Sequence, residues 1–510
     1  ARELLGRLVT RLPYDTEAWI EMAEVCREEG DLSAAIATLR RVVEEAPTHP
    51  RAWFLLAKAS ILSGDSRRAA DEYLVHALAV QNRLGSEPGR AEVLNAMGIA
   101  WQDLGEPDRA LENLEEAAEV RRRLGDRRGL AATLRNLGRV HLVRGDHARA
   151  EAAQTEAMAL LQHLDDPVGT AELYDDMGLL AEERGRYPQA LDLYRRALQI
   201  RRPLGQAVPL STSLRNVGWA SYLLGRFDDA MVYWSQGLEL ARKSGDQAGV
   251  VFGTQDVGML QIAQGDWDAG LESFLDALEE SRKLELPEAT AASLGHMGRI
   301  ALLQGRFRPA LSSFEEALKV LGELGDVRGQ VEFTLAEAET RLAMNDLSAA
   351  DKRLDVAEKL LLEGGSHEQK SELLRLRAEH HRRKGDRDAA RSAAAAAVSE
   401  AQASGAVVVL LQARLEQAVL DQRLSDLRAL NAEADRLGHR LLQLRVAEAL
   451  AEAALAQGDT REAEEAARNG IKAAEDSGSY ARTNRLRELL SAATSRSGPE
   501  KTAALRPTGP

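Results

Sequence analysis

The chain has 510 residues, of which 4% are aromatic, and it carries a formal net charge of −14 at pH 7. This acidic balance argues against nucleic acid as the main partner, because binding to phosphates requires a basic stripe. The single cysteine, Cys26, excludes an internal disulfide, and no apolar run approaches the roughly 20 residues of a membrane-spanning helix. We therefore expect a protein that is not inserted in a membrane and lies in the reducing cytoplasm.

The N-terminal part of the sequence predicts short helical repeats. Residues 1–15 are interpreted as the second helix of a truncated hairpin, so we expect a fragment of a longer protein or an artificial chain boundary. Residues 16–89 predict two hairpins with a period close to 34 residues, whose turns lie at Gly30 and Gly64.

Residues 90–365 show a regular period of 40 residues. Two antiparallel helices approach closely only where side chains are small, and a left-handed residue ends a helix without a steric clash. Both kinds of position recur here, so each of seven units predicts a helix, a tight turn and a second helix. The small residues are Gly98, Gly138, Gly178, Gly218, Gly258, Gly298 and Ala338, and the turn residues are Gly105, Gly145, Gly185, Gly225, Gly265, Gly305 and Asn345.

The segment Leu134-Arg135-Asn136-Leu137-Gly138, followed by Gly145 and Ala150, resembles the tetratricopeptide repeat. The 40-residue period is similar to that of the Leu-Gly-Asn regulators of heterotrimeric G proteins, kinesin light chains and bacterial peptide-sensing regulators. The resemblance implies an all-α fold, a right-handed α-solenoid superhelix of about twelve hairpins. We expect three looser repeats over 366–478, a capping helix over 479–497 and a disordered tail over 498–510.

The resemblance also implies where a partner binds. In this family the first helix of each repeat lines the concave wall, at positions six, three and two before the recurring small residue and one, four and five after it. Selected from these positions, the predicted partner-binding residues are Arg135, Asn136, Arg139, Asp175, Asp176, Arg215, Asn216, Trp219, Tyr222, Phe252, Gln255, Asp256, Met259, His296 and Arg299.

Two features of this wall admit alternative interpretations. Trp219 and Tyr222 share a helix face, and together with Phe252 they predict an exposed aromatic hot spot or, alternatively, packing between lengthened helices. Asn136 and Asn216 predict a clamp for the main chain of an extended peptide or, alternatively, a solvated polar face.

The sequence lacks a glycine-rich phosphate loop, His-Glu-x-x-His, Gly-x-Ser-x-Gly and Cys-x-x-Cys. We therefore expect a non-catalytic scaffold or adaptor, without metal or cofactor, that binds a peptide, a helix or a small regulatory protein. A small GTPase or another signalling protein is one such partner. The alternatives are a ligand- or peptide-responsive regulator whose effector domain is absent from this fragment, and an enzyme. The Arg-, Ala- and Gly-rich composition is typical of a GC-rich bacterial genome, and the oligomeric state stays open.

Overall fold

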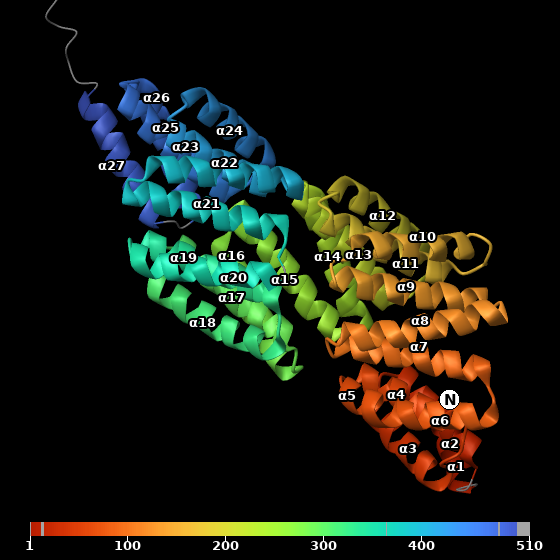
Figure 1. Ribbon diagram of the computed structural model, residues 1–510. Helices are drawn as coiled ribbons and strands as arrows, with labels where there is room; N and C mark the ends of the chain where they lie inside the picture. Colours follow the sequence, from red (N-terminus) through yellow and green to blue (C-terminus); the bar gives the residue numbers. More distant parts are fainter. Residues whose placement is uncertain (1, 12–14, 364, 478–479, 497–510) are drawn as a thin grey trace, which may run out of the picture. The chain divides into compact units, whose positions relative to one another are not determined.

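The computed structural model describes residues 2–11, 15–363, 365–477 and 480–496. In these ranges every secondary-structure element is a helix (Figure 1). The chain divides into two compact units, Ala1–Leu180 (unit 1) and Ala181–Pro510 (unit 2), and the division falls within helix α11 (Pro167–Glu183). The predicted tail at 498–510 lies outside the described residues, and the domain boundaries given above stay predictions.

Unit 1 is built from successive helical hairpins in which each helix contacts the next. It begins with α1 (Arg2–Arg11), where the truncated hairpin was predicted, and ends in α11. The intervening elements are α2 (Thr16–Glu28) with α3 (Leu32–Glu45), α4 (Ala52–Leu62) with α5 (Ser66–Arg68), a π-helical turn (Ala69–Tyr73) and α6 (Leu74–Leu84), α7 (Glu87–Asp103) with α8 (Pro107–Leu124), and α9 (Arg127–Val143) with α10 (His147–Leu161).

Unit 2 continues the same architecture. Its elements are α12 (Tyr187–Leu204), α13 (Ala207–Leu223) with α14 (Phe227–Ser244), α15 (Gln247–Gln264) with α16 (Trp267–Lys283), α17 (Pro287–Leu303) with α18 (Phe307–Leu324), α19 (Val327–Ala343) with α20 (Leu347–Glu363), α21 (His367–Lys384) with α22 (Arg387–Ser404), α23 (Val407–Asp421) with α24 (Leu424–Leu437), α25 (Arg440–Gln457) with α26 (Thr460–Asp476), and α27 (Tyr480–Arg496). Helix α27 packs on α25 and α26, as a capping helix does. The described residues thus form the expected all-α solenoid of about twelve hairpins.

The recurring small residues mark the closest contacts between paired helices. A Cβ atom added at Gly218 would lie 2.4 Å from Cδ1 of Trp234, and one added at Gly298 would lie 2.6 Å from Cε1 of Phe314. Both aromatic rings are fully buried. Each of these two hairpins therefore needs a residue without a side chain opposite the large residue that fills its core.

The turns have the predicted conformation. Gly105 has a φ of +70° and Asn345 has a φ of +60°, so both residues occupy the left-handed region that ends a helix. The Asp146 carboxylate caps the following helix, because it accepts a hydrogen bond from the Arg149 backbone N–H at 3.1 Å. Glu106 makes no such cap and instead forms an ion pair with Arg109 at 3.1 Å.

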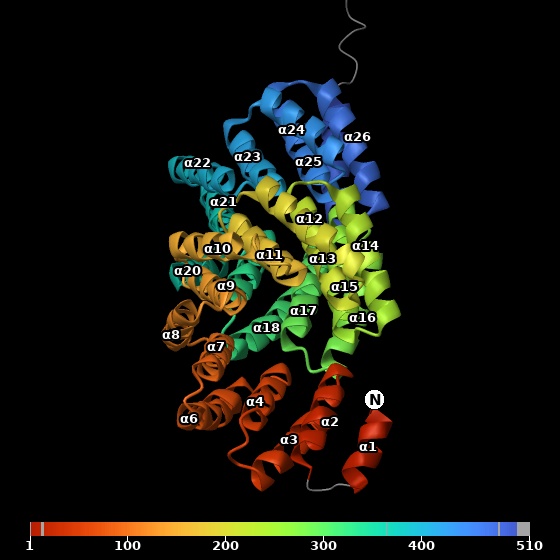
Figure 2. The same cartoon turned by 90° about the vertical axis from the view of Figure 1, so that its right-hand side faces the viewer.

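Within unit 2 the solenoid closes on itself, because early hairpins contact late ones. Helix α15 contacts α25, and Figure 2 shows these elements from a second direction. Gly185 packs against the end of α22, where an added Cβ would lie 2.4 Å from the Ser404 carbonyl oxygen. One buried cluster joins Trp267 of α16 to Leu442 of α25. This closure joins helices that the 40-residue period does not relate, and it was not predicted.

Candidate functional site

Unit 2 encloses a cavity of about 880 Å³, which we call the chamber. Its wall is formed mainly by α13, α17, α19, α21, α25 and α27, together with the C-terminal end of α11. Most of these are the first helices of their hairpins, as the family resemblance implies for a concave wall. The volume lies in the range of about 300–1,000 Å³ that is typical of small-ligand sites.

The positional rule for the concave wall describes much of the chamber. Applied at Gly298, it identifies chamber residues that include His296 and Arg299. Our prediction stopped at that repeat, and the same rule applied at Ala338 and Ala378 identifies further chamber residues that it missed. These are Glu332, Leu335, Ala336, Glu339, Ala343, Glu372, Arg375, Glu379 and Arg383.

The predicted aromatic residues separate into two groups. Trp219 lines the chamber, and its indole N–H donates a hydrogen bond to the Glu182 carboxylate at 2.6 Å. Tyr222 stacks on Trp219 with ring centroids 5.9 Å apart and also contacts Trp234, so its position fits the packing interpretation. Phe252 packs in another cluster beneath the guanidinium of Arg215, which lies 5.1 Å from the ring centroid.

The predicted residues of unit 1 contact one another or neighbouring repeats. Asn136 is buried, and its side-chain amide donates to Asn95 at 3.1 Å. Arg135 forms ion pairs with Glu172 and Asp176. Arg139 is exposed and Asp175 is half-buried. A partner-binding role for these residues stays a prediction.

The predicted residues of α13 and α15 are largely engaged within unit 2. Arg215 forms an ion pair with the buried Asp256 at 2.6 Å, and burial raises the pKa of that carboxyl group against the opposing effect of Arg215. The Gln255 amide donates to a backbone carbonyl of α17 at 2.6 Å. Asn216 is half-buried, and Met259 packs against the core. Their role in binding a partner also stays a prediction.

His296 and Arg299 lie in the chamber wall beside aromatic and acidic residues. The His296 ring stacks on Phe274 with centroids 4.9 Å apart, and burial lowers the pKa of His296 to about 4. The ring is therefore neutral at pH 7. Arg299 forms an ion pair with Glu332 at 3.2 Å.

One part of the chamber wall is rich in carboxylates. Glu182 accepts hydrogen bonds from Trp219 and, at 3.0 Å, from the Tyr194 hydroxyl, and burial raises its pKa despite these donors. The adjacent Glu183 pairs with both terminal nitrogens of Arg328, at 2.6 and 2.5 Å. Tyr187 donates to Glu368 in the same wall.

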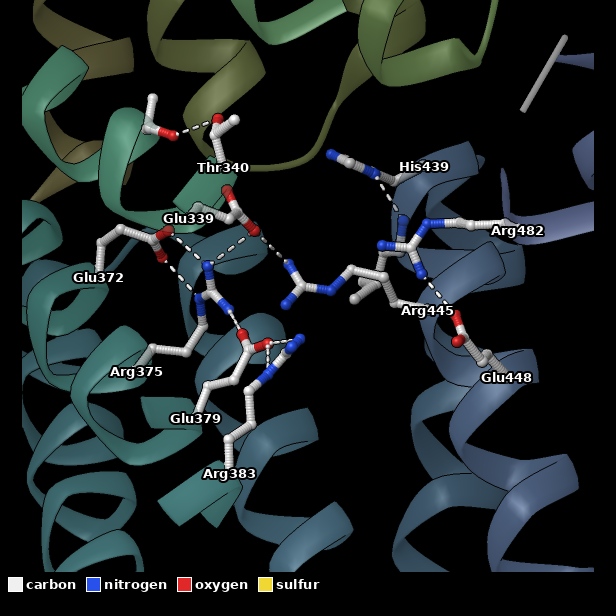
Figure 3. Close-up of polar contacts among 12 residues, drawn as sticks. Glu339, Thr340, Glu372, Arg375, Glu379, Arg383, His439, Arg445, Glu448 and Arg482 are labelled. Atoms are coloured by element: carbon white, nitrogen blue, oxygen red, sulfur yellow. Dashed lines mark hydrogen bonds and ion pairs between the residues drawn. The ribbon is translucent and has the colours of Figure 1, made fainter. Parts of the chain in front are cut away.

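Another part of the wall carries a network of arginines and glutamates in which Arg375 and Glu379 are buried (Figure 3). Glu372 forms an ion pair with Arg375 at 2.6 Å, and Arg383 forms one with Glu379 at 2.6 Å. Burial alone would raise the pKa of Glu372, but Arg375 outweighs it and the pKa falls to about 2. The network also includes Glu339, Arg445, Glu448 and Arg482.

In the described residues, no group of three or more His, Cys, Asp or Glu side chains is arranged to hold a metal ion. Across the same ranges, no helix combines the length and apolar character that crossing a membrane requires. The side chains that line the chamber offer hydrogen-bonding, ionic and aromatic contacts to a ligand.

Solved structures of several helical-repeat proteins resemble parts of this chain. Aspartyl phosphate phosphatase F from Bacillus subtilis has 11% identity and a TM-score of 0.49, over 68% of this chain and 94% of its own. A signal-transduction ATPase with a tetratricopeptide repeat sensor from Pyrococcus horikoshii has 14% identity and a TM-score of 0.44, over 64% of this chain and 51% of its own. BtubC from P. vanneervenii has 21% identity and a TM-score of 0.36, and the match covers 43% of this chain and 91% of BtubC. At these values no functional conclusion follows.

A comparison with curated protein sequences found no match. Models of protein families, in contrast, match several segments of the chain. Models described as tetratricopeptide repeat match residues 89–163, 169–243 and 251–323, residues 16–59 and residues 444–469. Together these matches cover more than half of the chain, and they agree with the helical hairpins and their recurring glycines. The chain belongs to the tetratricopeptide repeat superfamily.

Proposed function

We propose that the chain is a non-catalytic protein-interaction scaffold that binds a short, extended peptide in the chamber. Solenoids of this kind present extended concave surfaces for binding. The observation that carries the proposal is the chamber itself, about 880 Å³ in volume and lined by inner helices of unit 2. That volume suits a short peptide, so a folded signalling protein such as a small GTPase would bind elsewhere on the solenoid.

The composition of the wall indicates the chemistry of the peptide. An extended peptide has unpaired amide and carbonyl groups, and polar side chains such as Gln412 line the chamber together with Trp219. Carboxylates of Glu182 and Glu368 lie in one part of the wall, and arginines that include Arg375 and Arg445 lie in another. A peptide that carries both acidic and basic groups is the complementary ligand.

The closure of unit 2 favours a second function, that of a peptide-responsive regulator. Contacts such as the hydrogen bond from Tyr187 to Glu368 join segments distant in sequence. A ligand that binds the closed and open forms with different affinity shifts the population between them. A change in radius of gyration on peptide binding, measured by small-angle X-ray scattering, supports this function, whereas an unchanged radius favours a static scaffold.

A randomised hexapeptide library tests the proposed function. Ala292 is half-buried in the chamber wall on α17, so Ala292→Trp should place a bulky ring in the chamber and weaken the retention of peptides by the protein. Ala132 occupies the equivalent position of α9 in unit 1 and is also half-buried. Ala132→Trp is therefore the matched control and should retain the wild-type peptides. Retained peptides would be identified by mass spectrometry, and equal retention by both variants would contradict the proposal.

A further inference from the structure

Arg445 of α25 is a half-buried arginine whose one ion pair among the described residues is long. Its side chain is 16% exposed and lines the chamber. A guanidinium group has five N–H donors. Among the described residues, however, the one carboxylate within ion-pair distance of Arg445 is Glu339, at 3.6 Å, which is beyond a good hydrogen bond.

The neighbouring Arg375 shows what full compensation looks like. Its side chain is 2% exposed, and three carboxylates surround it: Glu372 at 2.6 Å, Glu339 at 3.2 Å and Glu379 at 3.8 Å. Burial acts to lower the pKa of Arg375, but these carboxylates outweigh it and the pKa is raised well above its ordinary value. Glu339, the carboxylate nearest to Arg445, is thus already paired with Arg375.

The pKa of Arg445 is shifted in the opposite direction. Burial lowers its pKa, and the positive charges of Arg375 and Arg482 lower it further, whereas Glu339 acts in the opposite direction. Arginine nevertheless stays protonated in proteins. Arg445 therefore carries its charge in a half-buried place where, among the described residues, its one ion pair is the 3.6 Å contact with Glu339.

The surroundings of Arg445 offer additional donors. Within the described part of the chain, Nη1 of Arg375 is buried and has no hydrogen-bond acceptor. Arg482 of α27 also lines the chamber and forms an ion pair with Glu448 at 2.6 Å. Figure 3 shows the Arg445 guanidinium between Arg482 and the Glu339–Arg375 pair. An anion bound here would meet the Arg445 guanidinium of α25.

We propose that Arg445 anchors a carboxylate group of the bound peptide. The planar guanidinium matches a carboxylate with two parallel hydrogen bonds, and the ligand supplies the counter-charge that Glu339 shares with Arg375. This inference rests on the proposed function and specifies the ligand as a peptide with an acidic group. The carboxylate comes from the peptide's C-terminus or from an aspartate or glutamate side chain, and the test distinguishes these sources.

The test uses two randomised hexapeptide libraries that differ only in a free C-terminal carboxylate or a C-terminal amide. Arg445→Met removes the charge and keeps much of the side-chain volume. Arg328→Met is the matched control, because Arg328 also lines the chamber but already has a bidentate partner in Glu183. Circular dichroism and thermal denaturation establish that both variants fold.

Two results support the proposal. Preferential retention of the free acids identifies the C-terminal carboxylate, and enrichment of Asp or Glu at one position in both libraries identifies a side chain. In either case Arg445→Met should weaken binding of the selected peptide about 10- to 100-fold. Arg328→Met should keep the preference for the acidic group.

Other results overturn the proposal. Retention of peptides without any preference for an acidic group, or unchanged affinity in Arg445→Met, refutes the role of Arg445 and leaves peptide binding intact. Retention of no peptide by wild type refutes the proposed function instead.

In that event acetate is the probe of the anion site, and the thermal midpoint in acetate is compared with that in chloride at constant ionic strength. A midpoint that is higher in acetate for wild type, but not for Arg445→Met, supports the site. No difference between the two salts refutes it.

Discussion

Substitution of Gly298 by alanine should destabilise unit 2, even though alanine favours helices. Gly298 lies in α17 against the fully buried ring of Phe314. An added Cβ would lie 2.6 Å from Cε1 and 2.8 Å from Cδ1 of this ring. These distances are well below van der Waals contact, so the ring or the helix has to move.

The magnitude follows from two opposing effects. Inserting a methyl group into a tightly packed core costs about 1–3 kcal/mol, and replacing glycine by alanine within a helix contributes about 0.5–1 kcal/mol of stability. Because the surroundings of Gly298 are tight, we expect the steric effect to dominate. The net loss in the free energy of unfolding should be about 0.5–2 kcal/mol.

Urea denaturation followed by far-ultraviolet circular dichroism measures the effect as a shift in the unfolding midpoint. Gly322→Ala is the control, since Gly322 lies in α18 and an added Cβ there meets no atom within 4 Å. It should stabilise the protein by up to about 1 kcal/mol. Phe314→Leu should restore part of the stability of Gly298→Ala. If Gly298→Ala unfolds at the wild-type midpoint or above it, the steric account of the 40-residue pattern is wrong.

Three further predictions concern closure, pH and the ionic network. Gly185→Ala should increase the radius of gyration in X-ray scattering, because its Cβ would lie 2.4 Å from a carbonyl oxygen of α22. Gly205→Ala is the control and should leave the radius unchanged, since Gly205 has a similar φ of +67° and an added Cβ meets no atom within 4 Å. Equal radii for the two variants would refute the closure contact. The pKa of His296 is about 4 in the folded protein and about 6.5 when unfolded, so neutral His296 contributes its full stability above pH 6.5. That stability is lost as pH falls, and the loss is about 2 kcal/mol at pH 5. His296→Phe should reduce this loss in thermal denaturation, and an unchanged pH profile would contradict the prediction. Glu372→Gln should cost about 1.5–3 kcal/mol in the free energy of unfolding, because Arg375 loses a charged hydrogen-bond partner; wild-type stability in thermal denaturation would exclude that contribution.

The hairpins could be predicted from the sequence because their determinants are local. Gly98 contacts Leu114, Gly218 contacts Trp234 and Gly298 contacts Phe314, and each pair is separated by the same short stretch of chain. A contact that recurs at a fixed separation leaves a fixed period in the sequence. The turns and their capping residues are visible for the same reason.

The closure of unit 2 could not be predicted, because it joins residues without a common period. The hydrogen bond from Tyr187 to Glu368 and the ion pair of Arg328 with Glu183 connect segments from different hairpins. Neither pair differs in sequence from the many charged residues on exposed helix faces. The chamber, which depends on closure, was therefore missed, although Trp219, His296 and Arg299 in its wall were identified.

The charge balance at Arg445 was equally invisible, because it depends on which carboxylates reach which guanidinium group. Arg375 and Arg445 both lie on the first helices of late repeats, α21 and α25. Their difference arises from Glu372 and Glu379, which lie on the same helix as Arg375. Sequence spacing gives the partners within a helix, whereas the sharing of Glu339 requires the folded structure.

A crystal structure of the protein with the most strongly selected hexapeptide tests the central claim most directly. If the chamber binds the peptide, we expect peptide density inside it, with a carboxylate group against the Arg445 guanidinium. Density on the outer helices of unit 2 or anywhere on unit 1, with the chamber unfilled by peptide, would contradict the account.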